Sequence, residues 1–305
     1  MRKPGTAPSR GGAPDPAVRA ADRSEDEAPV IRLEDVSKSY PGGVHALRGA
    51  SLDVRGGELL AVVGRSGSGK STMLHLMGTL DRPSTGRVLL RGHDVAELND
   101  RRLSAVRARW IGFVFQQFFL SPGRSAVDNV AEGLLYHGIT ARRRRALAVA
   151  ALRRVGLGHR LWHQPHEMSG GERQRTAIAR AIAIRPAVIL ADEPTGNLDS
   201  AAGAGVLALL RGLNAQGTTI VVITHDSALA EQLPRRVALL DGEIVEDSTA
   251  HPAPHPAPPP DHPDHPAPNP DLPVTHPAHP APNPAPPPDH PDHPAPYPAA
   301  EESAR

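Results

Sequence analysis

One octapeptide constrains the fold of this chain more than any other feature. Residues 64–71 read GRSGSGKS, which matches the pattern G-x-x-x-x-G-K-[ST], and they follow the continuous apolar run Leu59–Val63. Such a run is typical of a strand that is buried on both faces of a parallel sheet. Apolar residues then recur at helical spacing, namely Met73, Leu74, Met77 and Leu80. A strand, a glycine-rich loop and a helix in this order predict the opening of an α/β fold.

The residue types in this loop suit a phosphate ligand. Glycines allow backbone N–H groups to turn inward around phosphate oxygens, and the start of the following helix adds partial positive charge. We expect Lys70 to reach the β- and γ-phosphates of a nucleotide and the Ser71 hydroxyl to coordinate Mg²⁺. The alternative is a Gly/Ser turn that happens to contain a lysine, and the strand and helix around the loop argue against it. The candidate nucleotide-binding residues are Gly64, Arg65, Ser66, Gly67, Ser68, Gly69, Lys70, Ser71 and Thr72.

Composition divides the chain into three parts. Residues 1–29 mix Pro, Gly, Ala, Arg and acidic residues without apolar periodicity, and residues 249–305 are almost entirely Pro, Ala, His and Asp. Neither end has enough large apolar side chains to offset the entropy of ordering a backbone, so we expect both to be disordered. Residues 30–248 are long enough and apolar enough for one sizeable core. We therefore expect a single folded domain between two disordered segments.

A second pair of glycines precedes another helical pattern. Residues 168–175 read MSGGERQR, and the apolar residues behind them fall on one helix face. Ser169 can cap that helix, whose first N–H groups form a second anion site together with Gly170 and Gly171. Two phosphate-binding helix starts in one chain predict that two copies pack head to tail, each supplying half of every site. A plain helix cap would need neither both glycines nor the polar run after them.

With both motifs in place, residues 30–248 resemble the ABC ATPase family of P-loop NTPases. The resemblance implies an α/β fold with a RecA-like core, antiparallel β and α-helical subdomains, and Mg²⁺-dependent ATP hydrolysis. Residues 188–193 (VILADE) resemble the Walker B strand, which implies that Asp192 supports the Mg²⁺ shell and that Glu193 is the general base. A pair of solvated acidic residues is the alternative. Residues 194–199 resemble the D-loop, which communicates between the two sites of a dimer.

The same resemblance assigns three further site residues. Residues 113–116 (FVFQ) resemble the Q-loop, which implies that Gln116 senses Mg²⁺ and water beside the surface that touches a membrane partner. Gln117 follows directly, and we choose Gln116 because it follows Val-Phe as in the family. His225 matches the switch histidine that contacts the γ-phosphate, although a histidine at a strand end is more often structural. Tyr40 matches the position whose ring stacks on adenine.

Three short segments place the chain in one branch of the family. Residues 78–83, 192–199 and 241–245 are most similar to the macrolide-export, lipoprotein-release and cell-division ATPases. The resemblance implies coupling to integral membrane permease subunits on a separate chain, and the alternative is a cell-division-type ATPase that signals without transporting. A DNA-repair ATPase would need a long coiled-coil insertion between the Q-loop and the signature motif, where only about 50 residues lie. A translation-factor type would have two cassettes, and this chain has one.

Composition and charge bear on location and partners. The chain has no cysteine, which excludes disulfides and thiolate metal sites, and no run approaches the ~18 apolar residues of a spanning helix. We therefore expect it on the cytoplasmic face of the plasma membrane, held by its permease. The tail from Thr249 holds seven acidic residues and one arginine, which leaves 33 Lys and Arg against 26 Asp and Glu elsewhere. This modest basic excess fits a phosphate ligand or an anionic membrane and does not indicate nucleic acid.

Two charged or polar segments each allow two interpretations. Residues Arg142–Arg145 are the strongest charge run, and they indicate either a solvated helix face or attraction to anionic lipid beneath the permease. In the tail, PAPPPDHPDHPAP occurs at 256–268 and again at 284–296. Histidines three residues apart in polyproline II are separated by about 9 Å along the axis, too far to share one metal ion without a sharp bend. We therefore favour a solvated spacer over a metal site.

Overall fold

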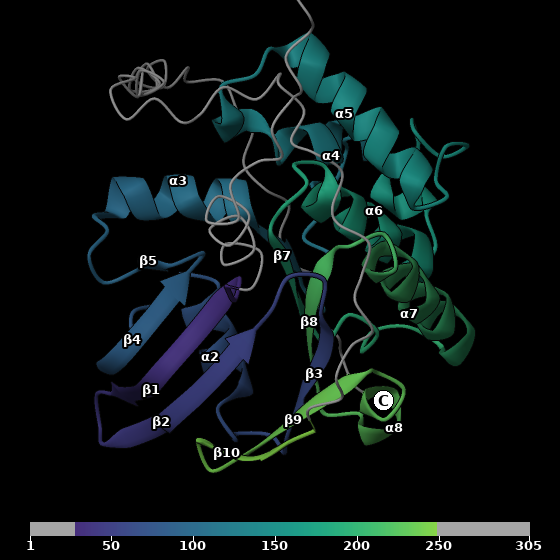
Figure 1. The fold of residues 1–305 in the computed structure, drawn as a ribbon. Coiled ribbons are helices and arrows are strands. Elements are labelled where there is room, and N and C mark those ends of the chain that lie inside the picture. Colours follow the sequence, from purple (N-terminus) through teal and green to yellow (C-terminus); the bar gives the residue numbers. More distant parts are fainter. Residues whose placement is uncertain (1–27, 249–305) are drawn as a thin grey trace, which may run out of the picture. The chain divides into compact units, whose positions relative to one another are not determined.

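The computed structural model describes residues 28–248 (Figure 1). The predictions for the two terminal segments, including the His-Pro repeats, fall almost entirely outside these residues. None of the helices in the described part is long and apolar enough to cross a membrane.

A six-stranded sheet forms the centre of the described region (Figure 1). Five of its strands are parallel, and the edge strand β10 is antiparallel to β9. In spatial order the strands are β10 (Glu243–Asp247), β9 (Arg235–Leu240), β3 (Leu59–Val63), β8 (Thr219–Thr224), β7 (Val188–Asp192) and β6 (Ile111–Val114). The parallel order places the carboxyl ends of β3, β8, β7 and β6 along one edge, where ligands bind in open α/β sheets.

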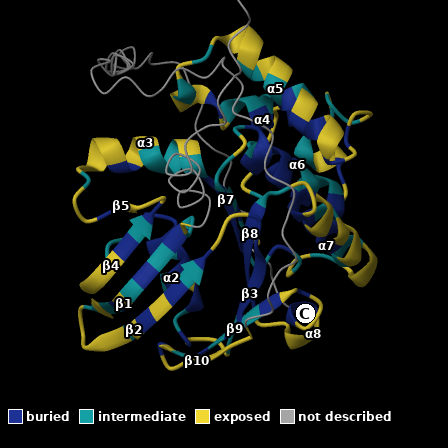
Figure 2. Cartoon of the chain, in the orientation of Figure 1, coloured by how far each residue is buried: buried dark blue, intermediate teal, exposed yellow. Residues whose placement is uncertain are grey.

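Both faces of this sheet are buried, as the continuous apolar runs predict. Along β3, Leu59 and Ala61 belong to one apolar cluster, whereas Leu60 and Val62 belong to another on the opposite face. The first cluster is covered by α4 (Ala126–Glu132), α5 (Ala141–Arg154), α6 (Gly170–Ile182) and α7 (Ser200–Asn214). The second is covered by α2 (Lys70–Met77), α3 (Asp100–Trp110) and a second sheet. Figure 2 shows the central strands buried between these layers.

The second sheet is antiparallel and has the spatial order β2-β1-β4-β5. Its strands are β1 (Ile31–Tyr40), β2 (Val44–Val54), β4 (Thr85–Leu90) and β5 (His93–Asp94). The buried Arg235 ties this sheet to the central one, because its guanidinium donates to the Asp53 carbonyl and to the carboxylates of Glu58 and Asp247. Short helices complete the fold: η1 (Leu135–His137), η2 (Pro165–Glu167) and α8 (Ser227–Ala230). The α/β fold with antiparallel and helical parts is therefore confirmed.

Particular residues set one tight turn and one helix end. The Asp241-Gly242 turn joins β9 to β10 with φ values of 48° and 87°, as a type I′ hairpin requires. The expected helix through Leu80 is wrong, because α2 ends at Met77 and Leu80 is 46% exposed. Gly78 ends the helix where any larger residue would meet the Phe113 ring, since a Cβ there would lie 2.6 Å from it.

Candidate active site

The predicted site residues gather at the carboxyl edge of the central sheet. The phosphate loop follows β3, the Asp192–Glu193 pair ends β7, and His225 follows β8. Because β3 pairs with β8 and β8 pairs with β7, these three segments are neighbours in space although they are up to 161 residues apart in sequence. Gln116 follows β6, which pairs with β7 on its other side. The sheet topology alone therefore brings four separate motifs to one edge.

The phosphate loop is shaped by close backbone approaches. A Cβ at Gly64 would lie 2.3 Å from the Leu239 carbonyl oxygen, and one at Gly69 would lie 2.2 Å from the Ala46 carbonyl oxygen. Gly69 also has a φ of 100°, a conformation that favours glycine. The Lys70 ammonium donates to the carbonyls of Gly64 and Arg65 at 2.8 Å each, so it lies inside the loop. The Ser68 hydroxyl is buried without a hydrogen-bond partner, which fits a loop built to receive polar oxygens.

Burial and charge perturb two ionisable groups beside the loop. Burial lowers the pKa of Lys70, and the carboxylates of Glu193 and Asp192 oppose this shift. Burial also raises the pKa of Asp192, with a further contribution from the Glu193 charge. The charges of Lys70 and Asp192 thus interact electrostatically across the edge of the sheet. A further cation beside Asp192 would favour its charged form.

Glu193 is held in a strained and well-determined position. Its φ of 45° lies in the left-handed region, which is uncommon for a residue with a side chain. Its Oε1 accepts hydrogen bonds from the backbone N–H of His225 at 2.9 Å and from the ring Nδ1 at 2.6 Å, and its Oε2 accepts from the Thr224 hydroxyl at 3.1 Å. Sequence reasoning missed Thr224, whose position directly before His225 was the available signal. Three donors therefore orient the predicted general base.

The Q-loop and the D-loop hold each other through side-chain amides. Gln116 donates through its side-chain amide to the Asn197 side-chain oxygen at 3.2 Å, and Asn197 donates back to the Gln116 carbonyl at 3.0 Å. A Cβ at Gly196 would lie 2.9 Å from the Gln116 amide nitrogen. Behind them the fully buried Gln174 donates to the Pro194 carbonyl at 2.7 Å. Of the two adjacent glutamines, Gln116 is the one that contacts the D-loop.

Oxygen donors at this edge fit a hard cation. Ser71, Asp192 and Gln116 offer a hydroxyl, a carboxylate and an amide oxygen, which are ligand types that Mg²⁺ accepts. Within residues 28–248, no three or more His, Asp or Glu side chains are gathered into a metal cage. A Mg²⁺ ion at this edge would therefore depend on water and phosphate oxygens for the rest of its shell.

Tyr40 lies at the end of β1, in the antiparallel sheet, and its contacts are to residues outside the phosphate loop. Its hydroxyl donates to Asp81 at 3.0 Å, and the same carboxylate accepts from the Lys38 ammonium at 2.6 Å. The Lys38 ammonium also lies 5.0 Å from the centre of the Tyr40 ring. The phenol is therefore tethered at its tip, which leaves the ring as the part available for stacking. Neither Lys38 nor Asp81 was identified from the sequence.

The start of α6 is stabilised by a reciprocal cap. The Ser169 hydroxyl accepts from the Glu172 N–H at 3.2 Å, and the Glu172 carboxylate accepts from the Ser169 N–H at 2.8 Å. Arg160 donates to the same carboxylate at 2.9 Å. Gly170 faces the D-loop of its own chain, since a Cβ there would lie 3.1 Å from Leu198, and Gly171 faces α7, since a Cβ there would lie 3.1 Å from Ala202. The start of α6 thus packs against the D-loop and α7 of the same chain.

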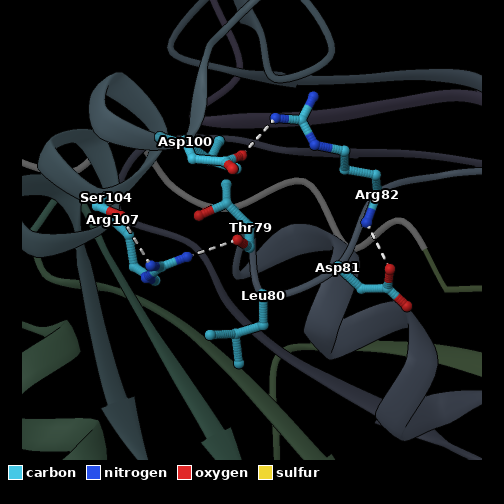
Figure 3. A pocket seen from close by; sticks show the side chains of 8 residues that line it. Thr79, Leu80, Asp81, Arg82, Asp100, Ser104 and Arg107 are labelled. Carbon is cyan, nitrogen blue, oxygen red and sulfur yellow. Dashed lines mark hydrogen bonds and ion pairs between the residues drawn. The ribbon is translucent and has the colours of Figure 1, made fainter.

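A cavity of about 290 Å³ lies beside α3, away from the sheet edge described above (Figure 3). The Arg107 guanidinium donates to the Thr79 carbonyl at 2.7 Å, and Arg82 pairs with Asp100 at 3.1 Å across its mouth. The residues that line it are Thr79, Leu80, Asp81, Arg82, Asp100, Leu103, Ser104 and Arg107. None belongs to the phosphate loop, so this cavity is separate from the predicted nucleotide site.

Comparison with known proteins agrees with this geometry. The family described as ABC transporter matches residues 47–196. The lipoprotein-releasing system ATP-binding protein LolD of Myxococcus xanthus is 48% identical over 221 residues, which cover 71% of this chain and 99% of that protein. The macrolide export ATP-binding/permease protein MacB of Brucella melitensis is 47% identical over 225 residues, which cover 73% of this chain. The chain spans only 35% of the length of that relative.

A solved structure shares the fold and has the same residue at 41% of the aligned positions. The dimeric post-hydrolysis state of an ATP-binding cassette bound to ADP and Pi superposes with a TM-score of 0.65 at 41% identity, covering 72% of this chain and 97% of that chain. Sequence identity of 48% along nearly all of an ATP-binding relative, together with the shared fold, shows the family. The chain belongs to the ATP-binding proteins of the ABC transporter family.

Proposed function

We propose that this chain binds ATP with Mg²⁺ at the phosphate loop and hydrolyses it to drive membrane permease subunits on a separate chain. The observation that carries the proposal is the Glu193 carboxylate, which three donors hold at the same sheet edge as Lys70 and Asp192. The LolD and MacB relatives are named for lipoprotein release and macrolide export, which supports a transport role.

The chain's own residues account for the chemistry as follows. Lys70 exchanges its two loop carbonyls for the β- and γ-phosphates, while the N–H groups of the loop and of the start of α2 bind phosphate oxygens. Glu193 accepts a proton from the water that attacks the γ-phosphorus, and ADP leaves as the γ-phosphoryl group is transferred to that water. His225 keeps the Glu193 carboxylate aimed and stands where it can contact the γ-phosphate. Ser71, Asp192 and Gln116 would hold Mg²⁺, which would neutralise part of the phosphate charge.

A head-to-tail pair of chains would complete each site. Ser169, Gly170 and Gly171 lie at the start of α6, and the N–H groups of this helix start would bind the γ-phosphate held by a second copy. The related cassette bound to ADP and Pi is dimeric, which supports this arrangement.

The proposed permease contact lies on the side of the Q-loop. Phe119 is 62% exposed and meets the Phe115 ring edge-on, and Phe115 in turn stacks on Phe113. An exposed apolar surface beside Gln116 suits a protein partner that senses the nucleotide site. We place the chain on the cytoplasmic face of the plasma membrane through that contact.

Purified Glu193→Gln protein tests the chemical assignment. We expect it to bind ATP and to form an ATP-dependent dimer, while phosphate release falls by about 100-fold or more because the variant cannot accept a proton. Lys70→Ala should bind ATP poorly. Glu231→Gln changes an exposed carboxylate directly after α8 and serves as the matched control. Near-normal hydrolysis by Glu193→Gln would refute the assignment.

A further inference from the structure

We propose that η1 and the first turn of α5 form a surface that binds anionic phospholipid headgroups directly. We call it the arginine-aromatic surface and define it by Leu135, Tyr136, Arg142 and Arg143. This contact requires no permease, so it goes beyond the proposed role in hydrolysis. It places the helical layer of the chain against the membrane.

The arginines lie at the start of α5, the end of a helix at which positive charge is least favourable. The helix begins at Ala141 behind the Thr140 cap, and four consecutive arginines fill its first turn without an acidic residue among them. The partial positive charge at a helix start repels cations and attracts anions. Arginines at this position destabilise the helix, so helix stability gives no reason for those that make no compensating contact within the chain. The same positive pole would strengthen the binding of an anionic surface.

Two of the four arginines have their charge engaged within the chain. Arg144 donates to the Ile139 carbonyl at 3.0 Å, and Arg145 pairs with Asp128 at 3.1 Å while covering the Trp162 ring. Arg142 and Arg143 are exposed, and the guanidinium group of neither makes an ion pair or hydrogen bond with residues 28–248. Two uncompensated positive charges therefore project from the start of the helix.

Apolar side chains are exposed in the short turn that precedes these charges in the chain. Leu135 is 46% exposed and Tyr136 is 90% exposed, and both belong to the short turn that precedes α5. Tyrosine has an apolar ring and a polar tip, a combination that is enriched where membrane proteins meet the headgroup layer. Figure 2 shows that the first turn of α5 is largely exposed. Positive charge and an exposed aromatic ring thus occur within seven residues.

The geometry favours lipid headgroups over an acidic protein surface. Successive residues of a helix point about 100° apart, so Arg142 and Arg143 extend in different directions from the same helix end. A rigid protein face would complement one of these directions, whereas mobile headgroups can surround the whole end of a helix. Long arginine side chains also extend readily to headgroup phosphates while their stems stay near apolar surface.

Vesicle binding by the full-length chain tests this proposal. The probes are phosphatidylcholine vesicles with and without phosphatidylglycerol, compared for the unaltered chain and for Arg142→Gln/Arg143→Gln. We expect binding only to the anionic vesicles, and about thirtyfold weaker binding by the double variant, since each arginine near such a surface contributes about fivefold. Arg48→Gln/Arg55→Gln removes the same charge from exposed positions on and after β2 and should bind as the unaltered chain does.

A second set of measurements separates lipid binding from folding. The melting temperature of Arg142→Gln/Arg143→Gln should stay the same or rise, because cations leave the positive end of α5. Tyr136→Ser should weaken vesicle binding without changing its dependence on anionic lipid. Equal losses in both double variants, or an unaltered chain that binds neither vesicle, would overturn the proposal. It would also be overturned if Arg142 and Arg143 governed only the capture of an acidic permease segment.

Discussion

The Nδ1 atom of His225 lies 2.6 Å from Oε1 of Glu193, and the backbone N–H of His225 donates to the same oxygen at 2.9 Å. The two residues end neighbouring parallel strands, and Glu193 reaches this position through a left-handed φ of 45°. A conformation that costs free energy persists only where surrounding contacts over-determine it. The hydrogen bonds from His225 and Thr224 hold Glu193 in this conformation. We therefore infer that His225 positions the carboxylate, in addition to its proposed contact with the nucleotide.

The first prediction concerns this contact. His225→Ala removes the ring donor but keeps the backbone N–H and the Thr224 hydroxyl, so the Glu193 carboxylate keeps two of its three donors and is less well aimed. We expect ATP binding to be retained and kcat to fall by about 10- to 100-fold, less than in Glu193→Gln. Phosphate release by the purified variant measures this, with His159→Ala at an exposed position as the control. An unchanged kcat would show that the ring has no positioning role.

The central sheet was predictable because its signal is local. A continuous apolar run such as Leu59–Val63 is needed only where both faces are covered, and the structure confirms that its residues alternate between two apolar clusters. The phosphate loop and the Asp241-Gly242 turn were predictable for a similar reason. A backbone position with positive φ favours glycine, and such a glycine can be recognised from a few neighbouring residues.

Contacts between distant segments were not predictable in this way. Apolar spacing alone extended α2 to Leu80, because the Phe113 ring that limits Gly78 lies 35 residues further along the chain. The Tyr40–Asp81 and Arg160–Glu172 pairs join residues whose spacing follows no helical or strand period. Such pairs depend on how β1, β4 and α6 pack, which single-sequence patterns do not encode.

The second prediction concerns shared sites. Ser169→Arg places bulk and positive charge where a second copy must dock, so each monomer should still bind ATP while hydrolysis fails. Mixing Ser169→Arg with Lys70→Ala chains should restore activity, because each mixed dimer has one site with both halves intact. About a quarter of the normal activity is expected if half of the dimers are mixed and the sites act independently. Normal hydrolysis by Ser169→Arg alone would show that one copy suffices.

The third prediction identifies Arg160 as a positioning residue for the start of α6. Its guanidinium holds the Glu172 carboxylate, which in turn accepts from the Ser169 N–H, so Arg160 acts on the proposed partner site through Glu172. Arg160→Ala should leave ATP binding by the monomer unchanged but weaken ATP-dependent dimer formation and lower hydrolysis by about tenfold. Arg160→Lys should recover part of this loss, because an ammonium can still pair with Glu172.

Two outcomes would contradict that role. A general loss of stability would lower the melting temperature of Arg160→Ala and Arg160→Lys without a selective effect on dimer formation. Equal activity of both variants and the unaltered chain would show that the reciprocal cap holds Ser169 in place without Arg160. Arg211→Ala, which removes a guanidinium that donates to the Gln232 carbonyl away from α6, serves as the control.

The last prediction concerns the pH dependence of stability. The hydrogen bond from the Ser169 backbone, helped by the Ser169 side chain and Arg160, lowers the pKa of Glu172 below its ordinary value of 4.5. A carboxyl group whose pKa is lowered on folding stabilises the fold above its unfolded pKa and loses that contribution as pH falls through its folded pKa.

Glu172→Gln keeps an oxygen acceptor for the Ser169 N–H but has no charge. It should therefore melt about 2–4 °C below the unaltered chain near pH 7, the shift expected for about 1 kcal/mol in a domain of this size. Melting curves for both chains from about pH 7 downward should converge as the pH falls below the lowered pKa of Glu172, where its carboxyl group is protonated. A difference that stays constant or widens on acidification would show that the Glu172 charge does not stabilise the start of α6.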